Sequence, residues 1–321
     1  MNNDTNTQMP RIIDPSAFPG VFRIVSIEHR AASLRQTHCM ARLFHERTSL
    51  TVTWTCRQFD TRLRDGLLAS IRWPGQCRQY GERVPISRLV LIERPVTSIN
   101  LFDTVPPTWV ADRELVARAR ALIDGLPDAF REYFTTILWD GLRFMRYVIG
   151  PSSLNGHHNG RCGNLHHSVD VCESALDMAR RDPHAFQPVL VLAALLHDAG
   201  KADEYSFDAR RRRFQISERG ALLGHKQTIV EWLAVARSRQ RLPLPERYYL
   251  ALLHCLTAAK AADYLGLRTP MSVEATILSM ADRLSGHSDL MGRMAPIDQG
   301  FGRYHPHLGG RPFMVKAAAP L

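Results

Sequence analysis

The pattern of apolar and polar positions divides the chain into a strand-rich first part and a helical second part. Up to about residue 95, short apolar stretches separated by turn residues predict β-strands. The expected strands cover 21–29, 38–45, 49–57, 67–73 and 87–94. Five short strands in so few residues favour a small closed β-barrel. An OB-fold is the obvious candidate, and an SH3-like barrel fits the strand count almost as well.

The stretch SLTVTWTCR at 49–57 shows how this sheet should place its side chains. Leu50, Val52, Trp54 and Cys56 alternate with polar residues and therefore share one face. We expect this face to be the core face, with Trp54 packed inside the barrel. The preceding residues ERT form a connection of hairpin length to the strand before it.

Beyond a linker with a Pro-Pro pair at 103–108, the periodicity changes to that of amphipathic helices. The expected helices cover 110–124, 127–148, 164–181, 186–199, 219–239, 245–264 and 271–286, with a loop over 151–163. The predicted fold class is α+β with two domains. We expect a flexible arm over 1–20, an OB-fold-like barrel over 21–102, an all-α domain over 103–291 and a C-terminal tail over 292–321.

The helix expected over 186–199 contains the apolar run VLVLAALL, which leads directly into His197 and Asp198. Such a helix is suited to burial on all sides, where an imidazole and a carboxylate are costly unless something there needs them. A divalent metal ion would meet that need. The alternative is a core helix with a polar end, in which His197 bonds to a backbone carbonyl. Gly200 is expected to be the C-cap with positive φ, and Lys201 to offer a positive charge to phosphate.

Further ionisable residues occur where core positions are expected. Histidines cluster over 157–167 and recur at 225 and 254, and Asp282 lies in the otherwise apolar segment ATILSMADRLS. One buried ionisable residue can be an accident of packing, but one on each of four helices indicates a convergent site. His and Asp ligands without a thiolate disfavour structural zinc and suit a catalytic cation that activates water for attack on a phosphoryl group.

Net charge adds a class of partner to this picture. The 321 residues include 41 Lys and Arg against 31 Asp and Glu, for a net charge of +10. This excess favours a polyanionic partner, although a host with a basic proteome would give the same value. In the predicted barrel, arginines are interleaved with aromatic residues, as in proteins that bind single strands by phosphate attraction and base stacking. Arg57, Phe59 and Tyr80 are the candidate contact residues.

Cysteine usage and hydropathy indicate the compartment. The six cysteines include no CxxC pair, and no apolar run reaches the length of a membrane span. The polar N-terminal stretch MNNDTNTQMPR does not resemble a signal peptide. We therefore expect a cytoplasmic protein with reduced thiols and no membrane association.

The order His167, His197-Asp198, Asp282 resembles the HD-domain superfamily of metal-dependent phosphohydrolases. More narrowly, four segments are similar to the YhaM-type 3′→5′ exoribonucleases, which join an N-terminal OB-fold to a C-terminal HD domain. The segments are PSSLNGHHNGRCGNLHHS, LLHDAGKADEYS, ISERGALLGH and EATILSMADRL. With the barrel, the resemblance covers about 21–291. It implies a metal-dependent phosphodiesterase acting on single-stranded nucleic acid, with RNA favoured over DNA, in a protein that can form homo-oligomers.

The resemblance also implies roles for individual residues. The metal ligands would be His167, His197, Asp198 and Asp282, with His225 helping to hold a second metal or a phosphate. Asp198, which would orient the attacking water, and Lys201 are the expected catalytic residues. Lys201, Glu204, His157 and His158 match residues expected at the substrate. For His157, His158 and Glu204 a purely structural loop role is an open alternative.

Departures from the family pattern bear on the number of metal ions. Ala259 and Lys260 stand where the family has a tandem histidine, Ser285 replaces its second aspartate, and Cys162-Gly163 replaces its Gly-Gly. One cation per site is therefore favoured over two. Manganese is the first expectation, with magnesium, cobalt or nickel as alternatives.

Two other functions remain open. The histidine-rich segment at 151–168 also resembles the MOBH relaxases of conjugative elements, which act on DNA, although a barrel at the N-terminus argues against that reading. Loss of the tandem histidine is equally compatible with a catalytically decayed HD domain that survives as a scaffold in a nucleic-acid-binding protein.

Overall fold

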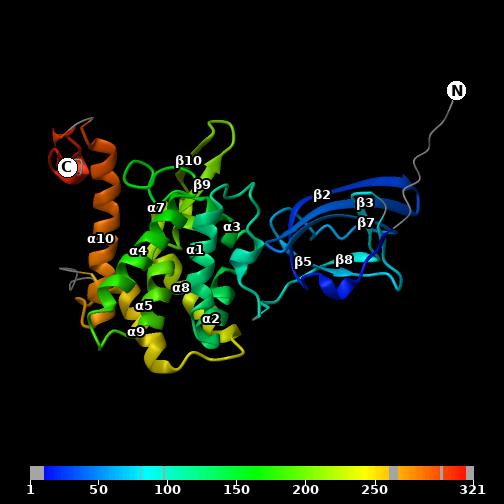
Figure 1. Cartoon of the computed structure of the whole chain (residues 1–321), viewed down its shortest axis with the longest axis horizontal. Coiled ribbons are helices and arrows are strands. Elements are labelled where there is room, and N and C mark those ends of the chain that lie inside the picture. The colour runs from blue at the N-terminus through cyan, green and yellow to red at the C-terminus, as the bar shows by residue number, and fades with distance from the viewer. Residues whose placement is uncertain (1–10, 80, 97, 260–266, 297–298, 316–321) are drawn as a thin grey trace, which may run out of the picture. The chain divides into compact units, whose positions relative to one another are not determined.

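A computed structural model describes residues 11–79, 81–96, 98–259, 267–296 and 299–315 (Figure 1). The chain forms two compact units. The first contains the residues up to Ala121 together with Trp139–Leu142, and the second contains Leu122–Leu138 and the residues from Arg143 onward. The predicted α+β class with two domains is confirmed: a curled β-sheet is followed by a helical region.

The first unit is built on a six-stranded sheet with the strand order β7-β4-β3-β2-β5-β8. Its strands are β2 (Phe22–Ser33), β3 (Gln36–His45), β4 (Thr48–Cys56), β5 (Leu68–Arg72), β7 (Arg83–Pro85) and β8 (Arg88–Leu91). β1 (Arg11–Ile12) and β6 (Arg78–Gln79) form a separate two-stranded sheet. All five expected strands are present, whereas β1, β6 and β7 are too short to leave an alternation pattern in the sequence.

The sheet curls into a half-barrel, and one extended stretch connects its two edges. β7 pairs parallel with β4, and β8 pairs antiparallel with β5. Between them, the Ile86 amide donates to the Thr53 carbonyl and the Ser87 amide donates to the Arg72 carbonyl, both at 2.9 Å. Residues 83–91 thus act as one strand shared between both edges. This arrangement fits the partly open five-stranded barrel of an OB-fold.

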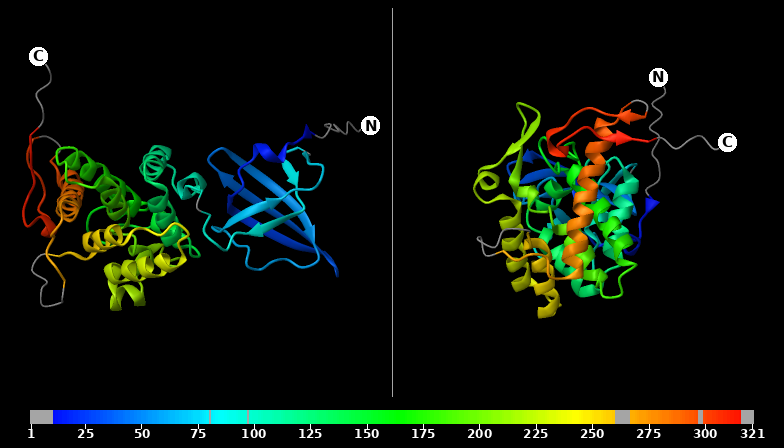
Figure 2. Two further views of the ribbon diagram at one scale, coloured as in Figure 1. Left: turned by 90° about the horizontal axis from the view of Figure 1, so that it is seen from below. Right: turned by 90° about the vertical axis from the view of Figure 1, so that its left-hand side faces the viewer.

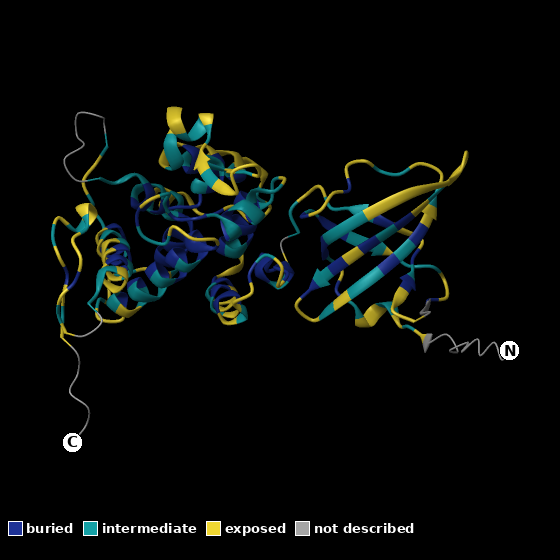
Figure 3. Cartoon of the chain, turned by 90° about the horizontal axis from the view of Figure 1, so that it is seen from above, coloured by how far each residue is buried: buried dark blue, intermediate teal, exposed yellow. Residues whose placement is uncertain are grey.

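The inner face of the sheet carries the apolar core of this unit. Phe22, Ile24 and Val52 are fully buried, and Trp54 is in the same cluster, as its place in the alternation predicts. Buried positions alternate with more exposed ones along β3 and in β4, and Figure 3 shows the buried positions on the strands of this sheet. Burial of one face is what fixes the register of a strand, because a slip of one residue would expose the whole set.

The second unit is helical. Its helices are α2 (Asp128–Leu138), α3 (Arg143–Ile149), α4 (Gly163–Ala179), α5 (Gln187–Leu196), α6 (Lys201–Glu204), α7 (Glu218–Leu222), α8 (Gly224–Arg239), α9 (Glu246–Thr257) and α10 (Val273–Met294), preceded by α1 (Arg113–Asp124), which starts in the first unit. α4 packs against α5 and α10, and α10 runs along the side of the unit (Figure 2). No helix among the described residues has the length and apolar character needed to cross a membrane.

Several boundaries differ from the expected ones for local reasons. The helix expected over 127–148 is broken between α2 and α3, where Gly141 has φ +52°. The helix expected over 219–239 is broken before Gly224, which has φ +70°. A left-handed φ cannot continue a right-handed helix. The end of the helix expected over 245–264 lies partly outside the described residues.

Two hairpins occur where no regular structure was expected. β9 (Tyr205–Asp208) pairs with β10 (Arg213–Ile216), and β11 (Gly300–Phe301) pairs with β12 (Phe313–Met314) in the C-terminal tail. These strands are short and partly exposed, so each has too few residues for an alternation that identifies a strand in a sequence.

Candidate metal centre

His197 directly follows α5, a helix that is almost entirely buried. Every residue of α5 from Val189 to Leu196 is buried, and His197 follows as the C-cap. Its Nδ1 lies 2.7 Å from the Ala194 carbonyl oxygen. Because that carbonyl can only accept, Nδ1 carries the proton, and Nε2 presents its lone pair to the opposite side. A hydrogen bond from His197 to a backbone carbonyl was also expected for a core helix with no metal. The same bond orients the ring as a second partner orients a metal-binding histidine.

His167, on α4, points its Nε2 at the same place. Its side chain is fully buried, and its Nδ1 lies 3.1 Å from the Ser285 hydroxyl on α10. The Nε2 atoms of His167 and His197 are 3.1 Å apart. Two nitrogen ligands about 2.1 Å from a common ion are separated by about 3 to 3.5 Å, so this distance suits a shared cation.

Asp282 on α10 completes a group of three. Its Oδ1 lies 3.0 Å from His167 Nε2 and 3.7 Å from His197 Nε2. The three ligand atoms all lie within 4.8 Å of one another, and no second group of this kind occurs in the part of the chain that the structure describes. Burial alone would raise the pKa of Asp282, but the two imidazoles beside it hold that pKa well below its usual value.

The chemistry of this donor set fits a divalent metal ion. Two imidazoles and one carboxylate include no thiolate, and the Asp282 side chain is 45% exposed, which leaves room for further oxygen ligands. The carboxylates already act on the imidazoles. Burial would lower the pKa of His197, but Asp198 and Asp282 outweigh this effect and raise that pKa.

Asp198 lies at the edge of this group and is held by Lys201. Its Oδ2 is 3.5 Å from both imidazole Nε2 atoms, and the Lys201 ammonium donates to the same oxygen. Ser152, fully buried, lies within 3.4 Å of both Asp198 and Lys201. Burial acts to raise the pKa of Asp198, but Lys201 and then the surrounding histidines keep it far below its usual value. Lys201 is thus beside the site, with its charge already paired.

His225 and Glu204 form a second hydrogen-bonded pair that faces Asp198. His225 Nδ1 lies 2.6 Å from Glu204 Oε2, and His225 Nε2 lies 3.5 Å from Asp198 Oδ1. Burial would raise the pKa of Glu204, but the bond to His225 lowers it. Glu204 ends α6 and His225 lies at the start of α8, and the packing of α6 against α8 brings both to the Asp198 side of the site.

Gly200 makes this approach possible, but not as the expected C-cap. Its φ is −60°, so the expected positive φ is wrong: α5 ends at Leu196, and Gly200 precedes α6. A Cβ at this position would lie 2.1 Å from the His225 carbonyl oxygen. The glycine is needed because the backbones of α6 and α8 meet here.

The loop over 151–162 places His157 and His158 against His167. The ring centroids lie 4.9 Å and 5.4 Å from that of His167. His158 has φ +45°, and its amide donates to Asp289 on α10. Burial, followed by the charges of His167 and Lys201, lowers the pKa of His157 to about 4, so this imidazole is neutral at pH 7.

Three polar residues of the site were not predicted as site residues from the sequence. Ser152 lies under Asp198, and Ser285, noted only as a replaced aspartate, contacts both His167 and His158. Asp289 holds the loop. A signal for two of them exists, because Asp282, Ser285 and Asp289 are spaced by three and four residues and so share one face of α10.

The other predicted residues lie elsewhere. Arg57 is exposed in the first unit, and Phe59 packs against the barrel core with one ring face stacked on His29, at a centroid distance of 4.0 Å. Tyr80 lies outside the described residues. His254 has a structural bond, since its Nε2 accepts from the Met271 amide at 2.9 Å.

Comparison with known proteins agrees with this geometry. No curated protein matches the chain. Residues 164–286 match the family model of the HD domain, a span that begins on α4 beside His167 and ends on α10 after Asp282. This match supports the HD superfamily and with it a metal-dependent phosphohydrolase. The helical unit of this chain therefore carries an HD domain.

Proposed function

We propose that this chain is a metal-dependent phosphodiesterase that hydrolyses single-stranded nucleic acid and removes nucleotides from the 3′ end of RNA. The observation that carries the proposal is the convergence of His167, His197 and Asp282. The basic, barrel-like sheet in the same chain supports a polynucleotide as the substrate.

The residues of the HD domain divide the chemistry between them. A divalent cation held by His167, His197 and Asp282 would neutralise charge on the phosphoryl group and make a water molecule acidic enough to attack it. Asp198, which its neighbours keep ionised, can accept a hydrogen bond from that water and orient it. Lys201 has three N–H donors, and it can turn one of them from Ser152 to a phosphate oxygen while retaining Asp198.

His225 is the candidate for binding the phosphoryl group at the Asp198 oxygen that Lys201 does not contact. Glu204 holds its Nδ1 at 2.6 Å and so fixes the orientation of the ring. Its Nε2 is directed towards Asp198, where in the imidazolium form, with both nitrogens protonated, it could donate to a phosphate oxygen. These roles for Asp198, Lys201 and His225 need no change in the backbone, because Lys201 and His225 already lie against the two oxygens of Asp198.

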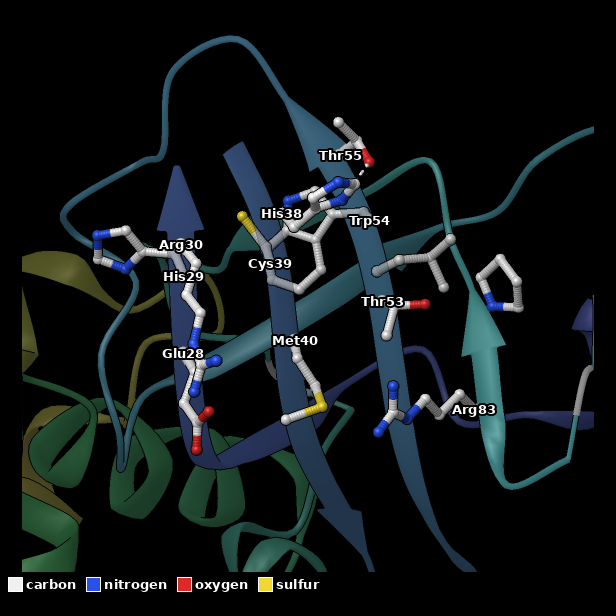
Figure 4. A pocket seen from close by; sticks show the side chains of 12 residues that line it. Glu28, His29, Arg30, His38, Cys39, Met40, Thr53, Trp54, Thr55 and Arg83 are labelled. Carbon is white, nitrogen blue, oxygen red and sulfur yellow. Dashed lines mark hydrogen bonds between the residues drawn. The ribbon is translucent and has the colours of Figure 1, made fainter. Parts of the chain in front are cut away.

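A groove on the sheet offers a binding surface for the polynucleotide. It has a volume of about 700 Å³ and runs across β2, β3, β4 and β7 (Figure 4). Arg30 and His38 are cross-strand partners in it, and Arg83 lies at its far edge. Arginine and imidazole groups beside Met40 and the threonines of β4 can bind phosphates while leaving the bases room to pack. Glu28 also lines the groove, so phosphates would bind beside the basic groups and away from this carboxylate. Of the three barrel residues predicted from the sequence, Arg57 remains a candidate contact at the surface.

The proposal is tested with a 5′-labelled single-stranded RNA, a DNA of the same sequence and saturating manganese. We expect a ladder of shortened products that retain the 5′ label, and no ladder when the 3′ hydroxyl is blocked. The variant that combines His197→Ala and Asp198→Ala should leave the RNA intact. His287→Ala is the matched control, because His287 is exposed on the same helix as Asp282.

The outcomes separate the alternatives. RNA that stays at full length with wild-type protein and manganese would contradict the proposal. Nicking of a supercoiled plasmid in place of RNA trimming would favour the relaxase-like function. Failure to bind manganese in calorimetry would favour a decayed HD domain.

A further inference from the structure

The hairpin β9–β10 is attached at both ends to segments that contribute residues to the metal centre. β9 follows directly on Glu204, and β10 leads through α7 to His225, so both ends of the hairpin are connected to residues of the site. Its base is closed by Ser217, whose amide donates to the Glu204 carbonyl at 2.8 Å and whose hydroxyl donates to the Asp203 carbonyl at 2.6 Å. The hairpin projects from the helical unit (Figure 1).

One face of the hairpin is apolar and aromatic. The register pairs Tyr205 with Ile216 and Phe207 with Phe214, and residues paired in this way share a face. The two phenylalanine rings lie 5.2 Å apart in an edge-to-face arrangement. Phe207 is 56% exposed and Ile216 is 54% exposed. Tyr205, at the base, lies against Glu204. The aromatic face therefore starts beside the metal centre and extends outward from it.

The tip of the hairpin is strongly basic. Arg210, Arg211, Arg212 and Arg213 are consecutive and exposed. Asp208 is the acidic group at this turn: it lies 3.8 Å from Arg211 and accepts from the Arg210 and Arg211 amides. Arg210, Arg212 and Arg213 form no ion pair within the described ranges. The tip thus offers an excess of positive charge to an anion in solution.

We propose that this hairpin is a substrate-binding arm on which a single-stranded nucleic acid lies as it enters the metal centre. Bases stack on Phe207 and Phe214, and the arginines of the tip bind the phosphates that follow. An apolar strip alone would suit many partners. This strip begins at the proposed phosphodiesterase site and ends in four arginines, so it combines surfaces for aromatic bases and for phosphates. That combination points to a polynucleotide. This inference rests on the function proposed above and locates its substrate within the HD unit.

The length of the arm predicts how binding affinity depends on the length of the oligonucleotide. Four strand residues span about 13 Å, which corresponds to about four nucleotides at a spacing of about 3.4 Å. Oligonucleotides of two or three residues would fill the metal centre alone, and longer ones would also reach the tip. Affinity should therefore rise between about three and eight nucleotides, and it should fall as salt is raised.

The test measures binding of fluorescein-labelled oligouridylates of increasing length to the full chain in the presence of EDTA, together with kcat and KM for an RNA of about 20 residues in manganese. We expect Phe207→Ala to weaken binding of the longer oligomers about tenfold and to raise KM more than it lowers kcat. The combination of Arg210→Gln, Arg212→Gln and Arg213→Gln should also flatten the salt dependence by about two units of slope. Its control combines Arg180→Gln, Arg181→Gln and Arg241→Gln, three exposed arginines outside the hairpin.

The results distinguish the arm from the function it serves. If wild type cleaves RNA and both hairpin variants bind every length as wild type does, the arm is wrong and the proposed function stands. If wild type neither binds nor cleaves, both fail. A change of molecular mass in light scattering with Phe207→Ala would overturn the arm in favour of a contact between copies. Unchanged manganese binding by the variants shows that the metal centre is folded.

Discussion

Ser285 holds His167 from the side opposite the metal group. Its hydroxyl lies 3.1 Å from His167 Nδ1 and 3.4 Å from His158 Nε2. Partners of this kind orient a metal-binding imidazole, and their loss typically lowers metal affinity about 10- to 100-fold. We expect Ser285→Ala to weaken manganese binding by that factor in isothermal calorimetry. Ser288→Ala, at an exposed position on the same helix, should bind manganese as wild type does. Equal affinities for the two variants would show that Ser285 does not orient His167.

Single residues were predictable from the sequence where their chemistry conflicted with their surroundings. His197 and Asp198 follow eight apolar residues, and Asp282 interrupts an apolar helix, so each is recognisable as a polar group at a buried position. Ser152 and Ser285 present no such conflict, because serine is common in loops and tolerated in helices. Their importance comes from contacts with residues more than 40 positions away, at Asp198 and His167.

At the scale of elements, the approach of α6 to α8 depends on Gly200. A Cβ there would lie 2.1 Å from the His225 carbonyl oxygen, a backbone atom that can move only if α8 moves. We expect Gly200→Ala to reduce the free energy of unfolding by about 2–4 kcal/mol, as overpacking of a close backbone contact does. Urea denaturation followed by circular dichroism measures this change.

Gly292→Ala is the matched control for that substitution. Gly292 lies in α10, and a Cβ there would meet no atom within 4 Å. Because alanine favours a helix interior over glycine, this variant should be unchanged or more stable by up to about 1 kcal/mol. A Gly200→Ala protein as stable as Gly292→Ala would contradict the close approach of α6 and α8.

Elements were predictable in proportion to the apolar face that each one buries. The alternation in 49–57 locates β4, because Val52 and Trp54 enter the core of the sheet. The hairpin β9–β10 was missed because Phe207 and Ile216 remain exposed, so its strands lack a buried face. Gly141 and Gly224 break helices through positive φ, which a glycine permits but does not require. The presence of a glycine therefore does not reveal which conformation it adopts. Gly200 was expected to have a positive φ, and its φ is −60°.

For the molecule as a whole, acid should destabilise both units, because His157 in the helical unit also has its pKa lowered to about 4. In the first unit, the contribution of His45 can be isolated. His45 is buried in that unit, and its Nδ1 accepts from the Arg47 amide at 3.2 Å. Burial, followed by the charges of Arg47 and Arg120, lowers its pKa to about 4. The unfolded chain binds the proton near pH 6.5. Stability is therefore fully present above pH 6.5 and is lost as pH falls towards 4, by about 1–3 kcal/mol.

Urea denaturation of the full chain between pH 7.5 and 4.5, followed by tryptophan fluorescence, measures this loss. His45→Gln provides the reference, since the glutamine oxygen can accept from the same amide and does not titrate. We expect a flatter pH dependence for the variant. Parallel curves for the two proteins would show that His45 is not the group responsible.

Metal binding should stabilise the second unit. A ligand that binds only the folded protein stabilises it by about 2.7 kcal/mol at 100 times its dissociation constant. Since His167, His197 and Asp282 all belong to the helical unit, manganese should raise its thermal midpoint, and EDTA should reverse the change. The response should disappear in Asp282→Ala and persist in His45→Gln, because the two residues lie in different units. Calorimetry of the three proteins, each with manganese and with EDTA, separates a specific site from non-specific binding of manganese, which would shift wild type and Asp282→Ala alike.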